Sequence, residues 1–263
     1  MKKLVLFLLV IINPSFSFTQ NRKLDSLRGL IKTDKDDTNK VIHLNTLSRQ
    51  YYNIGTYDST LLFANEALQV SQRMNPVYKR GMAGAYNNLG IVYWFEADYP
   101  KALDYDFKAM KIAEELNDKK GLSKCFGNIG LVYWNQRDFP KALDYFFKTL
   151  KLMEELNEKK GIAIVYGNIG LVYSDLSNFS KALDYDHKAL RMSEEMGDSG
   201  MIARNLGNLG IVYRAQGQYD KAMDNFFKAL KIDEALKNKR GIALRSTNIG
   251  SLYTEQKKYK EAA

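Results

Sequence analysis

A stretch of about forty residues recurs four times along this chain, and a fifth copy is incomplete at the end of the sequence. The copies align on the tripeptide Asn-Leu/Ile-Gly, whose asparagines are Asn88, Asn128, Asn168, Asn208 and Asn248. A fixed period of this length, in a chain without strand-like alternation, indicates stacked structural units that each contact only their neighbours. The sequence therefore predicts an all-α fold and directs the search for function to repeated surfaces.

Each repeat is expected to contain two helices. In the copy over residues 81–120, apolar residues recur at steps of three and four from Met82 to Tyr93, which is typical of a helix with one buried face. The pattern breaks before Pro100, a residue suited to the first turn of a new helix. The second apolar pattern extends to Leu116 and is followed by a polar loop.

A glycine recurs in the middle of each first helix, where it costs about 1 kcal/mol relative to alanine. These glycines are Gly90, Gly130, Gly170, Gly210 and Gly250. An alanine recurs on the second helix, at Ala102, Ala142, Ala182 and Ala222. We expect the glycine and the alanine to form the close contact of each helical hairpin.

The repeat resembles the tetratricopeptide repeat in five residues that keep both identity and spacing: Leu89, Gly90, Tyr93, Ala102 and Ala109. The usual repeat has 34 residues, so this sequence is similar to a longer variant. The resemblance implies a right-handed α-solenoid of antiparallel helix hairpins.

The sequence departs from the family pattern at one position of the second helix, where a large aromatic residue is usual. Phe146 and Phe226 match the pattern, whereas Asp106 and Asp186 replace the aromatic residue in the other two repeats. This substitution leaves the local packing open and does not change the predicted fold.

The N-terminus is typical of an export signal. Lys2 and Lys3 precede an unbroken apolar run, Leu4–Ile12, which is too short to cross a bilayer as a helix. We expect cleavage near residue 19 and export through the inner membrane to the periplasmic or extracellular side, with an uncleaved anchor as the alternative. The predicted segments are a signal peptide over 1–19, a capping helix and linker over 20–40, a degenerate repeat over 41–80, repeats over 81–120, 121–160, 161–200 and 201–240, and an incomplete repeat over 241–263.

The resemblance also implies a ligand groove. In the tetratricopeptide fold the first helices line a concave groove, and in peptide-binding members the asparagine before Leu-Gly bonds the backbone of an extended ligand. The asparagine ladder, Asn88, Asn128, Asn168, Asn208 and Asn248, occupies this position, and an amide can both donate and accept. The alternative is that these asparagines bond one another or neighbouring helices.

The predicted groove varies one helical turn beyond the ladder. The residues there are Trp94, Trp134, Ser174, Arg214 and Thr254. Tryptophan and arginine are enriched at binding hot spots, so we include Trp94, Trp134 and Arg214 in the predicted groove. The alternative is that both tryptophans fill gaps between repeats.

Several kinds of site are excluded by composition and spacing. Cys125 is the only cysteine, so neither an intramolecular disulfide nor a thiolate metal cluster can form. Asp184, Asp186 and His187 share one turn, but residues two apart on a helix do not face each other, and no metal site is expected. The sequence has no phosphate-binding loop, zinc-protease signature or nucleophile elbow. We therefore expect no enzyme and no cofactor. The formal charge of +9 is spread over helices that also carry acids, so we expect no nucleic-acid partner.

The sequence leaves two functions open. The first is an exported scaffold that binds a protein or an extended peptide in its groove. The second is the sensory region of a membrane signalling enzyme, because Leu24–Leu27 and Asp36–Thr38 resemble the segment before a membrane helix and a histidine kinase or nucleotide cyclase domain. The fifth repeat breaks off, so we expect a catalytic domain, a membrane segment or a capping helix to lie beyond Ala263. On the second reading the partner is the chain's own C-terminal signalling domain.

Overall fold

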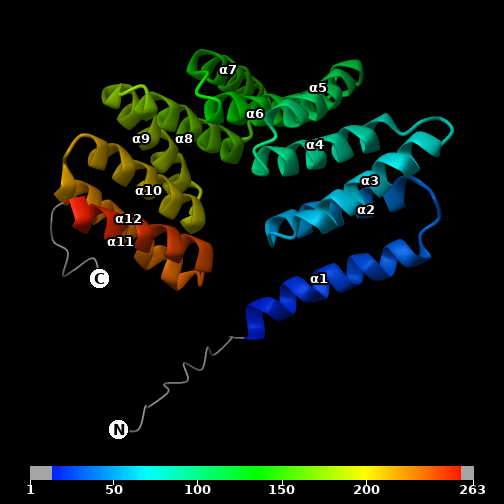
Figure 1. The fold of residues 1–263 in the computed structure, drawn as a ribbon, viewed down its shortest axis with the longest axis horizontal. Helices are drawn as coiled ribbons and strands as arrows, with labels where there is room; N and C mark the ends of the chain where they lie inside the picture. The colour runs from blue at the N-terminus through cyan, green and yellow to red at the C-terminus, as the bar shows by residue number, and fades with distance from the viewer. Residues whose placement is uncertain (1–13, 256–263) are drawn as a thin grey trace, which may run out of the picture. The chain divides into compact units, whose positions relative to one another are not determined.

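The computed structural model describes residues 14–255, and this part of the chain contains twelve helices and no strand (Figure 1). From α4 to α12 every helix has 17 residues, and within this range successive helices begin twenty residues apart. The predicted all-α fold is confirmed. The helices are α1 Pro14–Thr33, α2 Thr38–Asn53, α3 Tyr57–Arg73, α4 Lys79–Phe95, α5 Tyr99–Glu115, α6 Lys119–Asn135, α7 Phe139–Glu155, α8 Lys159–Asp175, α9 Phe179–Glu195, α10 Ser199–Ala215, α11 Tyr219–Ala235 and α12 Lys239–Glu255.

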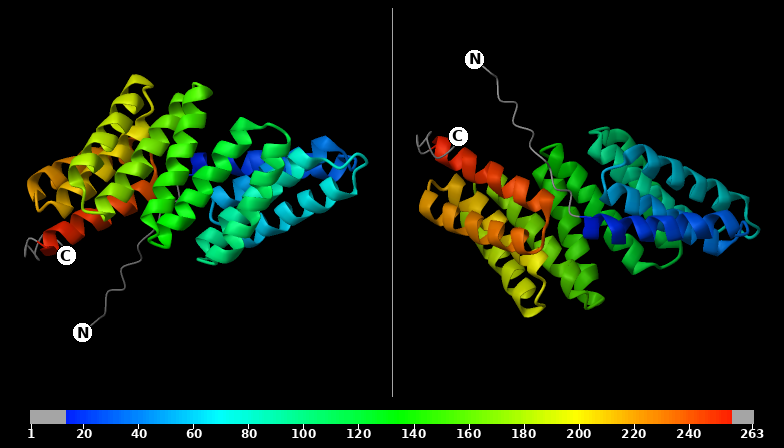
Figure 2. Two further views of the ribbon diagram at one scale, coloured as in Figure 1. Left: turned by 90° about the horizontal axis from the view of Figure 1, so that it is seen from above. Right: turned by 90° about the horizontal axis from the view of Figure 1, so that it is seen from below.

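The chain divides into two compact units, Met1–Ala97 and Asp98–Ala263, and the boundary falls between the two helices of the repeat over 81–120. In the first unit α2 and α3 form a hairpin, α4 packs on both, and α1 packs on α2. In the second unit each helix from α5 to α12 packs on the next, and α8 also contacts α10, as α10 contacts α12. These helices, green to red in Figure 2, form successive antiparallel hairpins. The predicted α-solenoid is therefore confirmed as stacked helix pairs.

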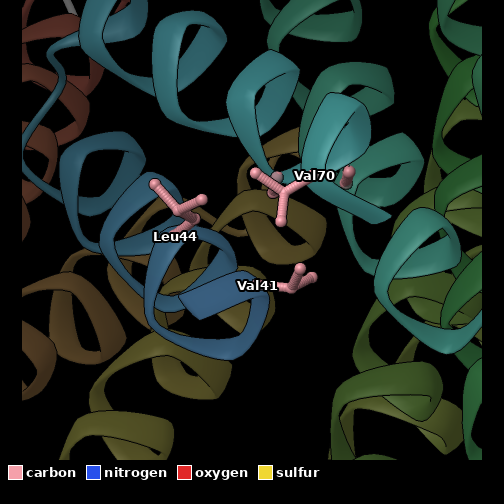
Figure 3. Close-up of a cluster of buried hydrophobic side chains, with 5 residues drawn as sticks. Val41, Leu44 and Val70 are labelled. Carbon is pink, nitrogen blue, oxygen red and sulfur yellow. The ribbon is translucent and has the colours of Figure 1, made fainter. Parts of the chain in front are cut away.

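The core of the first unit lies between its helices. Val41 and Leu44 of α2 face Val70 of α3, and all three side chains are buried (Figure 3). On the other side of α2, Leu24 and Leu27 of α1 pack against a second buried cluster. This contact buries Leu47 and Tyr51 of α2 on the side that faces α1.

The glycines of the second unit accommodate a larger side chain than expected. A Cβ atom at Gly130 would lie 2.7 Å from the ring of Phe146, and one at Gly210 would lie 2.5 Å from the ring of Phe226. At Gly170 the nearest atom is a carboxylate oxygen of Asp186, at 2.5 Å. The predicted contact of glycine with alanine is present at Gly170, where the backbone oxygen of Ala182 lies 3.3 Å from the Cβ position, but it is not the nearest contact. The alanines are buried, but the residue one turn later on the same helical face fills the space that the glycine leaves.

Short turns join the helices of the second unit. Each turn from α5 to α12 places one residue at a φ between 50° and 71°, and only two of the seven residues are glycine. In most of these turns a polar side chain then caps the next helix: the backbone N–H of Gly121 donates to Asp118, and that of Lys141 donates to Asp138. Helix length and turn geometry together set the twenty-residue spacing.

The apolar run of the predicted signal peptide lies outside the described residues. Within the described part, α1 begins at Pro14 and thus includes the last residues of the predicted segment 1–19. No helix of the described residues is long and apolar enough to cross a membrane.

Candidate functional site

The first helices of the repeats form one face of the second unit, made by α6, α8, α10 and α12 and called here the first-helix face. Two side-chain contacts connect neighbouring helices on it. The indole Nε1 of Trp134 donates to the carboxylate of Asp175 at 2.6 Å, which joins α6 to α8. Arg214 lies 3.8 Å from Glu255 and joins α10 to α12. Trp134 also packs against a buried apolar cluster, so this residue fills the gap between two repeats.

Two members of the asparagine ladder are bonded to neighbouring helices. Asn88, in the first unit, is buried, and its Nδ2 donates to the backbone oxygen of Asn45 at 3.0 Å. Asn128, in the second unit, donates to a carboxylate oxygen of Asp106 at 3.1 Å. Their amide donors therefore serve the fold, as the alternative interpretation of the ladder expects.

The other three asparagines differ from these two. Asn208 is buried close to Asp186, although neither oxygen of Asp186 has a hydrogen-bond partner of good geometry among the described residues. Asn168 is half-buried, and no side-chain hydrogen bond connects it to another residue of the described part. The Nδ2 atom of Asn248 is enclosed and likewise has no partner within residues 14–255.

The residue type on the preceding second helix explains this difference. Asp106 and Asp186 stand before Asn128 and Asn208, so each of these asparagines faces a carboxylate. Phe146 and Phe226 stand in the same position before Asn168 and Asn248, and a phenyl ring offers no acceptor. The sequence signal for this split was the alternation of aspartate and phenylalanine, which sequence reasoning treated only as a departure from the family pattern.

The two buried carboxyl groups are strongly perturbed. Asp106 is 1% exposed and Asp186 is fully buried. Burial raises the pKa of each to about 8, and the amides of Asn128 and Asn208 oppose this rise. Both groups are therefore mostly protonated at neutral pH, which reduces the cost of burying them without a cation. They stabilise the hairpins in the neutral form and are enclosed too deeply to act on a substrate.

The remaining predicted residues lie apart from these. Trp94 is on α4 of the first unit, half-buried, and its Nε1 has no partner among the described residues. Within residues 14–255 no cluster of potential metal ligands is present. Asp184 pairs with Lys188 at 2.8 Å and Asp186 is buried, so the residues around His187 do not converge.

Comparison with known protein families identifies the repeat. A family model described as "Tetratricopeptide repeat" matches residues 81–155, 161–235 and 201–263, which together span more than half of the chain. A comparison with curated proteins found no match.

Solved structures with the same fold include peptide complexes. A Rap protein complexed with competence and sporulation factor aligns over 94% of this chain and 74% of its own, at 16% identity and a TM-score of 0.71. NprR in complex with its cognate peptide NprX aligns over 94% and 71%, at 17% identity and a TM-score of 0.69. A signal transduction ATPase with a tetratricopeptide repeat sensor, from Pyrococcus horikoshii, aligns over 96% and 38%, at 16% identity and a TM-score of 0.72. At these identities the similarity establishes the fold.

Proposed function

The chain belongs to the tetratricopeptide repeat family, and we propose that it is a binding scaffold, not an enzyme, that holds an extended segment of a partner protein on its first-helix face. The observation that carries the proposal is the amide of Asn168 in the middle of this face, which forms no side-chain hydrogen bond within residues 14–255. An extended peptide presents N–H and C=O groups that such an amide can bond whatever the ligand's side chains are. Two proteins of the same fold are complexed with peptides, which supports this class of ligand.

In this proposal only part of the asparagine ladder bonds the ligand. Asn168 is the rung that bonds the ligand, because it follows a phenylalanine-bearing helix and is only half-buried, whereas the Nδ2 atom of Asn248 is enclosed. Asn128 donates to the buried carboxyl group of Asp106, Asn208 lies beside that of Asp186, and Asn88 donates to a backbone carbonyl. The contacts of Trp134 and Arg214 fix the spacing of the first helices and so position the rungs.

The experiment begins with a displayed library of random peptides selected on the full chain. The affinity of the selected peptide is then measured by calorimetry for the wild type, Asn168→Ala and Asn65→Ala. Asn65 is exposed on α3 and donates to its own helix, so its substitution is the matched control. Loss of two hydrogen bonds of about 0.7 kcal/mol each predicts about tenfold weaker binding for Asn168→Ala alone. Equal affinities for all three proteins would contradict the role of Asn168.

Export is part of the proposal and rests on the sequence of residues 1–12. Mass spectrometry of the N-terminus, after expression in a bacterium and recovery from the periplasm or the medium, tests it. Removal of about nineteen residues is expected, by the arrangement of charged, apolar and small residues in signal peptides. Retention of the intact chain in the cytoplasm would contradict export.

A second candidate function is the sensory region of a signalling enzyme. It is favoured by the Pyrococcus horikoshii ATPase, in which a tetratricopeptide repeat sensor is part of a larger signalling protein. Sequencing of the gene beyond the codon for Ala263 tests this function. A membrane-spanning segment followed by a catalytic domain would support it, and a stop codon after one capping helix would contradict it.

A further inference from the structure

The hairpins of the second unit repeat one aromatic cluster. In the α6–α7 hairpin, Tyr145 stacks on Tyr133 with 5.7 Å between ring centroids. The ring of Phe126 lies 5.9 Å from that of Tyr145. Lys141 lies over the ring of Tyr133 at 5.0 Å. The cluster therefore lies between the two helices of this hairpin.

The next hairpin repeats the cluster residue for residue. In α8–α9, Tyr185 stacks on Tyr173 at 5.7 Å, and Tyr166 lies 5.8 Å from it. Phe147 of the preceding second helix adds an edge contact at 6.4 Å, and Lys181 lies over the ring of Tyr173 at 5.0 Å. Four aromatic side chains thus occupy this position between successive second helices.

The third hairpin, α10–α11, keeps only one of the four rings. Tyr213 is retained, with Lys221 over its ring at 5.4 Å. Leu206, Asn225 and His187 replace the other three aromatic residues. The amide of Asn225 turns back and donates to the backbone oxygen of Lys221 at 2.8 Å, so it does not reach Tyr213 as a tyrosine ring would.

A cavity of about 500 Å³ occupies the place of the missing rings. The four residues that stand in place of the aromatic cluster, Tyr213, Leu206, Asn225 and His187, all line the cavity. Its apolar wall also includes Leu190 and Ile232. Lys228 and Lys231 on its edge are exposed, as is His187, so the cavity opens to solvent between α9 and α11. It lies among the second helices and α10, and is a different site from the first-helix face.

We propose that this cavity binds an aromatic side chain of a partner protein, whose ring stacks on Tyr213. The sister hairpins show that the space accepts a tyrosine ring, because Tyr145 and Tyr185 occupy it at the same register. Tyr213 and Lys221 already hold the arrangement that Tyr173 and Lys181 have beneath their ring. Offset stacking and burial of the ring drive the binding.

The test is a titration of the ¹⁵N-labelled chain with N-acetyl-tyrosine amide, followed by NMR. Saturable shifts of the backbone amides around Leu206, Tyr213 and Asn225 are expected. Asn225→Tyr restores the sister residue and should abolish these shifts. Asn135→Tyr is the matched control, because Asn135 is an exposed asparagine that also donates to its own helix, and binding should be retained.

A second variant removes a ring instead of adding one. Tyr185→Asn removes the ring from the α8–α9 hairpin and should create a second site, seen as new saturable shifts around Tyr173. Absence of saturable shifts in the wild type, or unchanged shifts in Asn225→Tyr, would overturn the proposal. So would a dimer of the wild type that Asn225→Tyr converts to a monomer, because the occupant would then be a second copy of this chain.

Discussion

Asp106 and Asp186 are buried carboxyl groups in a family position that usually holds an aromatic ring. Each is close to one asparagine, and no cation pairs with either of them among the described residues. An ionised carboxylate in this place would be very costly, so the folded chain keeps both groups protonated. Their high pKa therefore makes the stability of the hairpins depend on pH.

The direction of this dependence follows from the two pKa values. The pKa of Asp186 is about 8 in the folded chain, against an ordinary value of 3.8 for an exposed aspartate. The unfolded chain releases the proton first, so the free energy of unfolding decreases as pH rises from about 4 to about 8. The decrease is at most about 1.4 kcal/mol per pH unit for each group.

Asp186→Asn should remove this contribution, because an amide has a similar shape and does not titrate. Urea denaturation at pH 5 and pH 8 measures the effect. The free energy of unfolding of the variant, taken relative to that of the wild type, is expected to be higher at pH 8 than at pH 5. Asp106→Asn should behave in the same way. Parallel pH profiles for wild type and variant would show that the buried carboxyl groups do not titrate in this range.

The asparagines are expected to differ in stability as well. Asn128→Ala removes the donor to a buried carboxyl group and should cost about 1–3 kcal/mol. Asn168→Ala breaks no side-chain hydrogen bond of the described residues and should stay within about 0.5 kcal/mol of the wild type. Chemical denaturation of the two variants separates them, and equal losses would indicate that Asn168 is also a structural residue.

The residue scale is where sequence reasoning was weakest. The recurrence of asparagine before Leu-Gly predicted five equivalent rungs, yet Asn88 and Asn128 donate to different groups and Asn168 to none of those described. For Asn128 and Asn168 the role is decided by a residue about twenty positions earlier, Asp106 or Phe146, on the preceding helix. A side-chain contact of this kind depends on the stacking of the hairpins, which a pattern along one helix does not contain.

At the scale of the element, the repeat is a series of helices of equal length joined by tight turns. Sequence reasoning predicted the paired helices correctly, because apolar periodicity and Pro100 mark them directly. It did not predict the left-handed turn residues. Ser177 and Lys237 occupy this conformation with φ of 56° and 54°, and neither residue type favours it.

These turns offer a direct test of backbone strain. Ser177→Gly should stabilise the chain by about 0.5–1 kcal/mol, since a left-handed conformation costs a residue with a Cβ about 1–2 kcal/mol and glycine almost nothing. The mirror substitution, Gly217→Ala at a φ of 71°, should destabilise by a similar amount. Thermal or urea unfolding of both variants measures the difference. A loss of stability in Ser177→Gly would mean that the serine side chain makes a contact of greater value than the strain.

At the scale of the whole molecule, the repeats give the chain its own internal comparison. Equivalent positions in different repeats hold different residues. Phe146 lies beside the central glycine of one repeat and Asp186 beside that of the next, and Tyr185 of the aromatic cluster corresponds to Asn225. The shared residues explain why the hairpins stack, and the differing ones single out Asn168 and the cavity at Tyr213. The family and the solenoid fold could be predicted from the sequence, whereas these two sites required the packing of neighbouring hairpins.

The central claim is that a ligand lies on the first-helix face of the second unit. Photo-crosslinking tests it most directly, with a library-selected peptide that carries a photoreactive group and with mass spectrometry to locate the attached residues. Crosslinks are predicted on α6, α8, α10 and α12, with the greatest yield near Asn168. Crosslinks concentrated on α7, α9 and α11 would contradict the claim.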